Sequence, residues 1–258
     1  MLARLYSVQA RLLPRGPVDV VRQVLLFGIT YYGYRIVRGT VDDPVGAAVA
    51  FQHSREVIHL EQSLGIFVEP SIQGWTSSRP GLIDVASWLY LNAQFTVTMA
   101  CLVFMYLRHN SSFYFVRNMF GVAMWTANLG FMLFPAAPPR FFPEWGFTDS
   151  VANLTHVTSD SVAVNSLVNQ YAAIPSMHVA FALMIAVPLA RLSKHRVTRV
   201  IWTLYPVVVV FVIISTANHF VTDGVLGAMT AGVAAWTAAW LARARPAAWA
   251  FEPAKATA

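Results

Sequence analysis

The chain alternates between long apolar runs and shorter polar segments. Six apolar runs approach or reach the roughly 20 residues that a helix needs to cross a bilayer. They cover residues 18–37, 82–107, 113–135, 175–190, 200–217 and 223–241, and the fourth would lengthen if it began near Tyr171. Few residues within these runs are charged. The pattern therefore predicts an all-α fold, a polytopic bundle of six transmembrane helices.

Two longer polar-rich segments, about 38–81 and 136–171, lie on the same side of this predicted bundle. In the first, apolar and charged residues recur between Ala47 and Leu64 in a pattern typical of an amphipathic helix at the membrane interface. Prolines crowd the start of the second, where they disfavour helix and predict an extended or turning path. The later, polar part of this second loop could cover a site.

Composition limits the class of protein. Hydrophobic residues make up 57% of the chain and charged residues 12%, with a mean hydropathy of +0.54, which excludes an ordinary soluble domain. We expect one membrane domain, 18–241, between a cytoplasmic segment, 1–17, and a flexible cytoplasmic tail, 242–258. The first run is longer than a signal peptide and carries Arg22, so we expect it to be retained. The single cysteine, Cys101, excludes a disulfide within the chain.

The net charge of +6 indicates membrane orientation rather than nucleic-acid binding. With six spans, the basic residues near both termini, Arg108 and Arg117 beside the second turn, and the basic cluster at 191–199 share one side. The positive-inside rule makes that side cytoplasmic. We therefore expect a multi-pass plasma-membrane protein with both termini in the cytoplasm and no nucleic-acid partner.

Five polar side chains fall at the opposite, non-cytoplasmic face. Arg140 follows the third run, Ser176 and His178 begin the fourth, and His219 and Asp223 begin the sixth. On a helix, His219 and Asp223 would share a face, so the carboxylate could hold one imidazole nitrogen and leave the other free to react. Arg140 offers a fork of donors to phosphate oxygens, and Ser176 at a helix start could donate to the same anion. One histidine could attack phosphorus while the other protonates the departing oxygen.

Simpler explanations exist for each residue taken alone. His219 and Asp223 could be a helix-stabilising pair, His178 an interfacial histidine, and Arg140 an anchor to lipid headgroups. A metal site made of both histidines and Asp223 has acceptable ligands, but Ser176 and Arg140 suit an anion better. A transporter or lipid-binding protein could use the same polar set. Transport is disfavoured because these residues lie at span ends and the chain shows no internal repeat.

Two segments resemble motifs of the type-2 phosphatidic acid phosphatase superfamily, whose fold is shared with vanadium haloperoxidases. The Pro-Ser-Met-His run at 175–178 is similar to the second motif of that family. The Asn-His pair at 218–219 with Asp223, followed by Gly224 and Gly227, is similar to the third. The resemblance implies that His219 is the nucleophile that forms a phosphohistidine and that Asp223 orients it. It further implies that His178 is the general acid, that Ser176 helps to bind phosphate, and that neither a metal nor another cofactor is needed.

The first motif departs from the usual superfamily pattern. A lysine usually stands seven residues before an Arg-Pro pair. Here Leu133 stands seven residues before Arg140, and Phe141 takes the place of the proline. Ile213 occupies the place of a usual arginine before the third motif. The Pro-Pro-Arg form of the first motif resembles the branch that includes inositol phosphorylceramide synthase. Segments at 60–69, with Glu61 and Glu69, and at 169–173 are also similar to that branch, and the resemblance covers about 45–235.

The resemblance implies a metal-independent membrane lipid phosphotransferase, similar to inositol phosphorylceramide synthase. Its substrate would be a phospholipid or lipid phosphate, and the reaction would take place at the non-cytoplasmic face. Hydrolysis of a lipid phosphate or a polyprenyl pyrophosphate is the alternative, since water could replace an alcohol as the acceptor. A non-enzymatic lipid transporter or binding protein is the second alternative.

Overall fold

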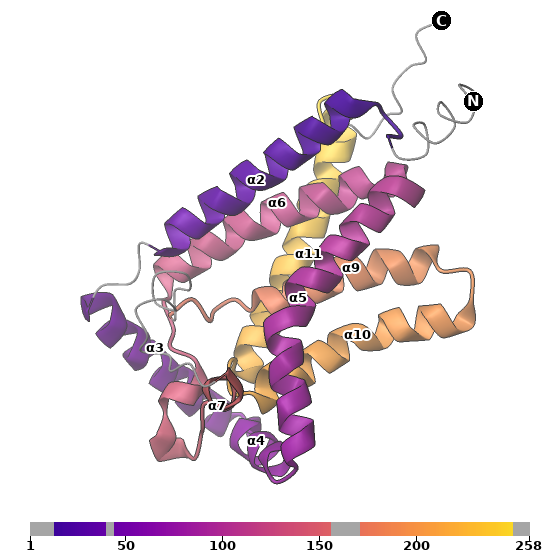
Figure 1. Ribbon diagram of the computed structural model, residues 1–258. Helices are drawn as coiled ribbons and strands as arrows, with labels where there is room; N and C mark the ends of the chain where they lie inside the picture. The colour runs from indigo at the N-terminus through magenta and orange to yellow at the C-terminus, as the bar shows by residue number, and fades with distance from the viewer. Residues whose placement is uncertain (1–12, 40–43, 156–170, 250–258) are drawn as a thin grey trace, which may run out of the picture.

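The computed structural model describes residues 13–39, 44–155 and 171–249, and in these ranges the chain is mainly helical (Figure 1). The α-helices are α2 (Pro17–Gly39), α3 (Pro44–Ser63), α4 (Glu69–Ser77), α5 (Pro80–Arg108), α6 (Asn110–Leu133), α7 (Ser150–Thr155), α9 (Met177–Leu192), α10 (Arg196–Ser215) and α11 (Val221–Ala244). The extended pairing among the described residues is one isolated bridge between Ala136 and Ala172. The prediction of an all-α fold is confirmed.

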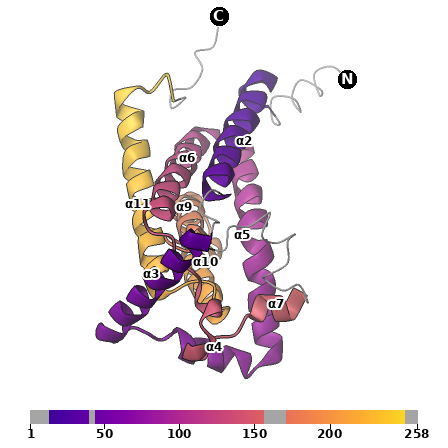
Figure 2. The same cartoon turned by 90° about the vertical axis from the view of Figure 1, so that its left-hand side faces the viewer.

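The long helices form a bundle around a buried apolar core. Helix α11 packs against α6 and α9, α9 packs against α10, and α2 lies along α6. Helices α3, α4 and α7 gather toward one end of the bundle, where α4 contacts α5 and α10 (Figure 1 and Figure 2). The start of α2 and the end of α11 lie toward the other end. The shorter helices therefore build a cap over one end of the bundle.

Three helices among the described residues, α5, α10 and α11, are long and apolar enough to cross a membrane. Helix α9 is apolar but has only 16 residues. All six predicted ranges hold helices, yet α2 and α6 are not among these three, and polar residues such as Arg22, Arg35 and Asn128 lower the mean hydropathy of their sequences. Length and composition thus support a membrane protein without establishing six spans.

Two local predictions need correction. Helix α9 does not extend back to Tyr171 but begins at Met177, because Pro175 precedes it and residues 174–176 are wedged between two helices. A Cβ on Gly130 of α6 would lie 2.6 Å from Cδ of Pro175, and one on Gly227 of α11 would lie 2.2 Å from the Ser176 carbonyl oxygen.

The proline-rich segment is also less extended than expected. It holds two single-turn 3₁₀ helices, Pro139–Phe141 and Pro143–Trp145, each of which begins with a proline. A proline suits a first helical position because that residue's N–H has no partner within the helix. The predicted amphipathic helix at 47–64 is present as α3.

Three predicted features lie outside the described residues, wholly or in part. They are most of the N-terminal segment 1–17, the polar positions at 156–170 in the second loop, and the last residues of the tail 242–258.

Candidate active site

His219, Asp223 and His178 lie together where α9 and α11 begin. Nδ1 of His219 is 3.1 Å from Oδ2 of Asp223, and Nε2 of His219 is 3.3 Å from Nδ1 of His178. Asp223 is fully buried and His219 is 6% exposed. The His178 ring stacks on Tyr90 of α5, with the ring centroids 4.7 Å apart. The histidine of the third motif thus has a carboxylate on one ring nitrogen and a second imidazole on the other.

The expected contact between His219 and Asp223 forms, but its expected cause, a shared helical face, is wrong. Helix α11 begins only at Val221, after a sharp turn in which Ala217 adopts a positive φ of 52°. The backbone N–H of His219 donates to the Ile213 carbonyl at 3.2 Å, which closes this turn. Asp223 reaches back as a capping residue and accepts the Phe220 N–H at 3.0 Å.

The Asp223 carboxylate also assigns the tautomer of His219. Because a carboxylate only accepts hydrogen bonds, the Nδ1 that faces it carries a hydrogen. In neutral His219, Nε2 then presents a lone pair toward His178. The pair is arranged so that His219 can act as a nucleophile or base and His178 can hold a proton beside it.

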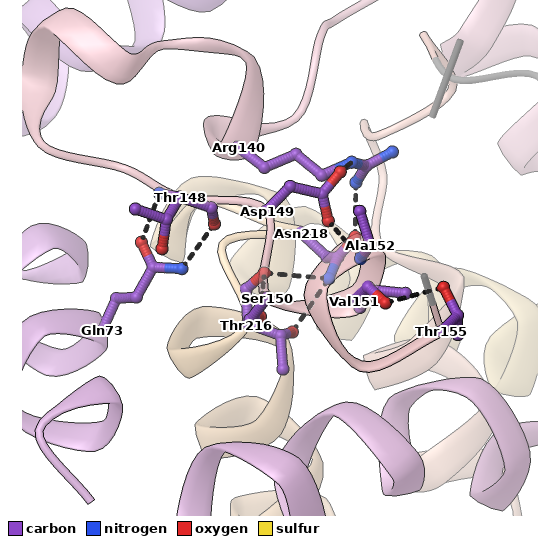
Figure 3. A network of polar contacts seen from close by, with 10 residues as sticks. All are labelled: Gln73, Arg140, Thr148, Asp149, Ser150, Val151, Ala152, Thr155, Thr216 and Asn218. Atoms are coloured by element: carbon purple, nitrogen blue, oxygen red, sulfur yellow. Dashed lines mark hydrogen bonds and ion pairs between the residues drawn. The ribbon is translucent and has the colours of Figure 1, made fainter. Parts of the chain in front are cut away.

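Arg140 lies next to this pair through Asn218, the residue before His219. Its backbone N–H donates to the Ala217 carbonyl at 2.8 Å, and its Nη1 donates to Oδ1 of Asn218 (Figure 3). Nε of Arg140 lies 3.6 Å from Oδ2 of Asp149, in the loop before α7. The amide of Asn218 in turn donates to both oxygens of Thr216. The guanidinium, 13% exposed, is therefore fixed by a network that continues into the His219 turn.

Ser176 occupies the junction between α9 and α11. It is the N-cap of α9, and its backbone N–H donates to the Asp223 carbonyl at 3.0 Å. Its hydroxyl is fully buried and has no hydrogen-bond partner among the described residues. A buried hydroxyl without a partner is destabilising, so an oxygen of a bound ligand would satisfy it.

Side chains of helices α3 and α4 hydrogen-bond to the backbone segments that carry the site. Gln73 of α4 exchanges two hydrogen bonds with the backbone of Thr148, next to Asp149 (Figure 3). Ser54 of α3 donates to the Ala137 carbonyl at 2.8 Å, three residues before Arg140. Glu61 and Glu69, both fully buried, accept the N–H groups of Thr222 and Val221 at the start of α11, each at 2.7 Å.

The sequence predicts the five candidate site residues but not all of their partners. Asn218 belongs to the third motif, but its contact with Arg140 is not predicted. Glu61 and Glu69 enter only through the resemblance, and Asp149 is not predicted at all. These three acidic residues reach the site from segments whose sequence carries no spacing relation to the motifs. The signal that could have marked the two glutamates is a charged pair flanking an apolar turn at 64–68.

An apolar pocket borders His178 on its far side. Side chains of α5, α9 and α10 line it, among them Tyr90, Phe181, Tyr205, Val209 and Ile213. Among the described residues, no group of three or more His, Cys, Asp or Glu side chains is arranged to hold a metal ion.

Comparison with known proteins gives one family match. The model of the PAP2 superfamily, the type-2 phosphatidic acid phosphatases, matches residues 55–237. No curated protein and no solved structure matches the chain significantly. The matched range includes the candidate site and both glutamates.

Proposed function

Because the chain belongs to the PAP2 superfamily, we propose that it is a membrane lipid phosphotransferase, similar to inositol phosphorylceramide synthase, that works through a phosphohistidine on His219. Membership of the superfamily supports phosphatase- or phosphotransferase-type activity. The observation that carries the finer proposal is the double contact of His219, with Asp223 on one ring nitrogen and His178 on the other.

In the first step, Nε2 of His219 attacks phosphorus in line with the leaving oxygen. The P–O bond breaks as the P–N bond forms, and His178 gives its proton to the departing oxygen. The positive charge that develops on the His219 ring is stabilised by the buried Asp223 carboxylate. In the second step, the acceptor hydroxyl gives its proton to His178 and its oxygen attacks phosphorus. The P–N bond then breaks, and both histidines return to their starting states.

Arg140 and Ser176 would bind the equatorial phosphate oxygens. Arg140 is the one permanent cation among the five expected site residues, and Asp149 partly balances its charge. His178 is positive only while it holds the proton for the leaving oxygen. Leu133 and Ile213, which stand where related chains usually carry cations, are respectively 79% and 1% exposed and bring no charge. A phosphomonoester carries about −1.5 to −2 charges at neutral pH, whereas a phosphodiester carries one. A site with a single permanent cation therefore favours a phosphodiester donor, as in a headgroup transferase.

The apolar pocket beside His178 supports a lipid substrate. Its walls come from α5, α9 and α10, so apolar surface lies directly beside His178, as expected where a phosphate attached to a lipid reacts. A soluble phosphate ester would leave this apolar surface exposed to water.

We further propose that α2, α5, α6, α9, α10 and α11 all cross the plasma membrane. The short α9 would be completed by the residues 171–176 that precede it. Both termini would then be cytoplasmic, and the site would lie at the outer face, reacting without a metal.

Incubation of purified protein with labelled phosphodiester lipids and lipid phosphates, in EDTA and with a lipid alcohol, tests the proposal. We expect a new phosphodiester lipid whose formation needs the added alcohol and is lost in His219→Ala. Release of free phosphate alone would instead identify a phosphatase, and turnover that persists in folded His219→Ala would refute the nucleophile.

A further inference from the structure

Three buried carboxyl groups converge on the first turn of α11. Oε1 of Glu69 accepts the Val221 N–H and Oε1 of Glu61 accepts the Thr222 N–H, while Oδ2 of Asp223 accepts the Phe220 N–H. The first N–H groups of a helix have no partner within the helix. Here successive ones are satisfied by side chains from α3, α4 and α11 itself. The turn that carries His219 is therefore held by contacts far from it in sequence.

The turn between α3 and α4 brings the two glutamates together. Gly65, with a φ of +69°, ends α3 in a Schellman motif: the Ile66 N–H donates to the Glu61 carbonyl and the Gly65 N–H to the Gln62 carbonyl. The chain then reverses, and Glu69 becomes the first residue of α4. The two carboxyl groups then bind the N–H groups of adjacent residues, Val221 and Thr222, and Glu61 contributes to the raised pKa of Glu69.

A single proton explains how this pair can be buried. Oε2 of Glu61 and Oε2 of Glu69 are both buried, and neither has a hydrogen-bond partner among the described residues. A carboxylate only accepts hydrogen bonds, so two ionised groups could not bond to each other, but one protonated group donates to the other. The partial positive charge of a helix N-terminus, about +0.5, is too small to balance both of them and Asp223.

From this geometry we propose that Glu61 and Glu69 share one proton and act as positioning residues, which hold the first turn of α11, and with it His219 and Asp223, in the reactive arrangement. The proposal rests on the proposed function, since it assigns His219 the role of nucleophile. The pair touches no substrate. Loss of its proton would place two negative charges side by side and loosen its hold on Val221 and Thr222.

The charge state of the pair depends on its own surroundings. Burial, and then the neighbouring Glu61, raise the pKa of Glu69 from 4.5 to about 8. The other titratable groups near the start of α11 are His219 and Asp223. Helix α10 meets α4 through its apolar end, and Asp84 on α5 is exposed. Glu69 therefore keeps its proton at neutral pH and loses it in mildly alkaline solution.

Glu69→Gln removes the proton that titrates but keeps the hydrogen bonds of the side chain. The amide oxygen can still accept the Val221 N–H, and the NH₂ group can donate to Glu61, but nothing titrates. With a donor whose leaving group needs no protonation, we expect wild-type kcat to fall above about pH 8. In Glu69→Gln we expect the fall to move up by at least one pH unit, with kcat at pH 7 within about threefold. Glu69→Leu, which cannot accept the N–H, should lose kcat at every pH with little change in KM.

Glu56→Gln is the matched control, since it removes an exposed carboxyl from α3, the helix that carries Glu61, and should keep the wild-type profile. If kcat falls above the same pH in Glu69→Gln and in Glu61→Gln as in the wild type, the positioning role is overturned. Full activity of Glu69→Leu would overturn it too.

Thermal unfolding separates this proposal from the proposed function because it needs no substrate. A carboxyl whose pKa is raised in the folded state contributes stability that is fully present below its unfolded pKa, near 4.5, and is lost as pH rises to about 8. We expect the Tm of the wild type to fall over this window relative to that of Glu69→Gln. If Tm changes with pH in the same way in the wild type and in Glu69→Gln, the shared proton is refuted, whether or not a substrate turns over.

Discussion

His219 is bounded by two groups of opposite character, a carboxylate at Nδ1 and an imidazole at Nε2. In the proposed mechanism, the carboxylate favours the positive ring that would form when Nε2 attacks phosphorus. The second imidazole, 3.3 Å from Nε2 in this structure, would supply the proton of the leaving oxygen. The proposal thus gives the two histidines different tasks, and substitutions should separate them.

His178→Gln should slow transfer from an ordinary lipid donor by about 10²–10⁴-fold, the usual contribution of a general acid. A donor with a nitrophenolate leaving group needs no protonation. With that donor, His178→Gln should release a burst of one equivalent of nitrophenol and then slow, because His178 is also the base of the second step. His219→Ala should show no burst, and a burst in His219→Ala would contradict the division of roles. Stopped-flow absorbance measures both.

Asp149→Asn tests how the charge on Arg140 is balanced. The substitution removes the ion pair to Nε while the contact with Asn218 remains. A less neutralised Arg140 should favour a more negative ligand, so the ratio of kcat/KM for lipid monoesters over phosphodiesters should rise several-fold. An unchanged ratio would mean that Asp149 does not tune the charge of the site.

Motif residues could be predicted from sequence, whereas their partners could not. Arg140, Ser176, His178, His219 and Asp223 follow from residue type and position at span ends. The four-residue spacing of His219 and Asp223 predicted their contact for the wrong reason, since capping geometry replaces the helical face. Asp149, Glu61 and Glu69 approach through tertiary packing, which a single sequence does not encode as a spacing.

At the scale of elements, the site depends on how closely two helices approach the segment 174–176. Gly130 of α6 and Gly227 of α11 leave room for this segment, whereas Gly224 meets only an ordinary contact with Val179, 3.7 Å from the position of a Cβ. The close approach brings Ser176 against the first turns of α11. The glycines of the third motif thus have unequal roles.

Gly227→Ala should therefore destabilise the protein by about 1–3 kcal/mol, the usual effect of overpacking, and lower activity at least tenfold by displacing Ser176. Gly224→Ala is the matched control, on the same helix, and should change both quantities little. Unfolding in detergent and the transfer assay give the two measurements. Equal effects of the two substitutions would contradict the packing argument.

The apolar runs predicted the positions of the long helices well, because most residues of each long helix are apolar and this is visible in the local sequence. The short elements were harder. Helices α4 and α7 and the two 3₁₀ turns depend on contacts such as those of Gln73 with Thr148, so local sequence did not reveal them. The start of α9 was predicted to within two residues, but the possible extension back to Tyr171 is absent, because close packing by α6 and α11 fixes the path before the helix.

At the scale of the whole molecule, the reactive groups lie toward one end of the bundle, and the start of α2 and the end of α11 toward the other (Figure 1). A cluster at that second end joins the helices: Asp19 of α2 accepts hydrogen bonds from Tyr106 of α5 and Tyr114 of α6, at 2.9 and 2.6 Å. A lipid enzyme with this layout would act on one leaflet only.

Single cysteines test this orientation. Ser77, at the end of α4, is exposed on the side of the site, and Lys194, between α9 and α10, is exposed in the basic loop. In a Cys101→Ala background, Ser77→Cys should react with an impermeant maleimide added outside intact cells. Lys194→Cys should react only after permeabilisation. The reverse pattern would invert the proposed topology.

Trapping the covalent intermediate tests whether His219 is the nucleophile. Purified His178→Gln would be mixed with an activated, labelled phosphodiester in EDTA, quenched in alkali, and analysed by peptide mass spectrometry. We expect a stoichiometric, alkali-stable phosphorus adduct on the peptide that holds His219, and none when His219 is also replaced by alanine. An adduct on another residue, or turnover without any adduct in a protein that lacks His219, would contradict this assignment.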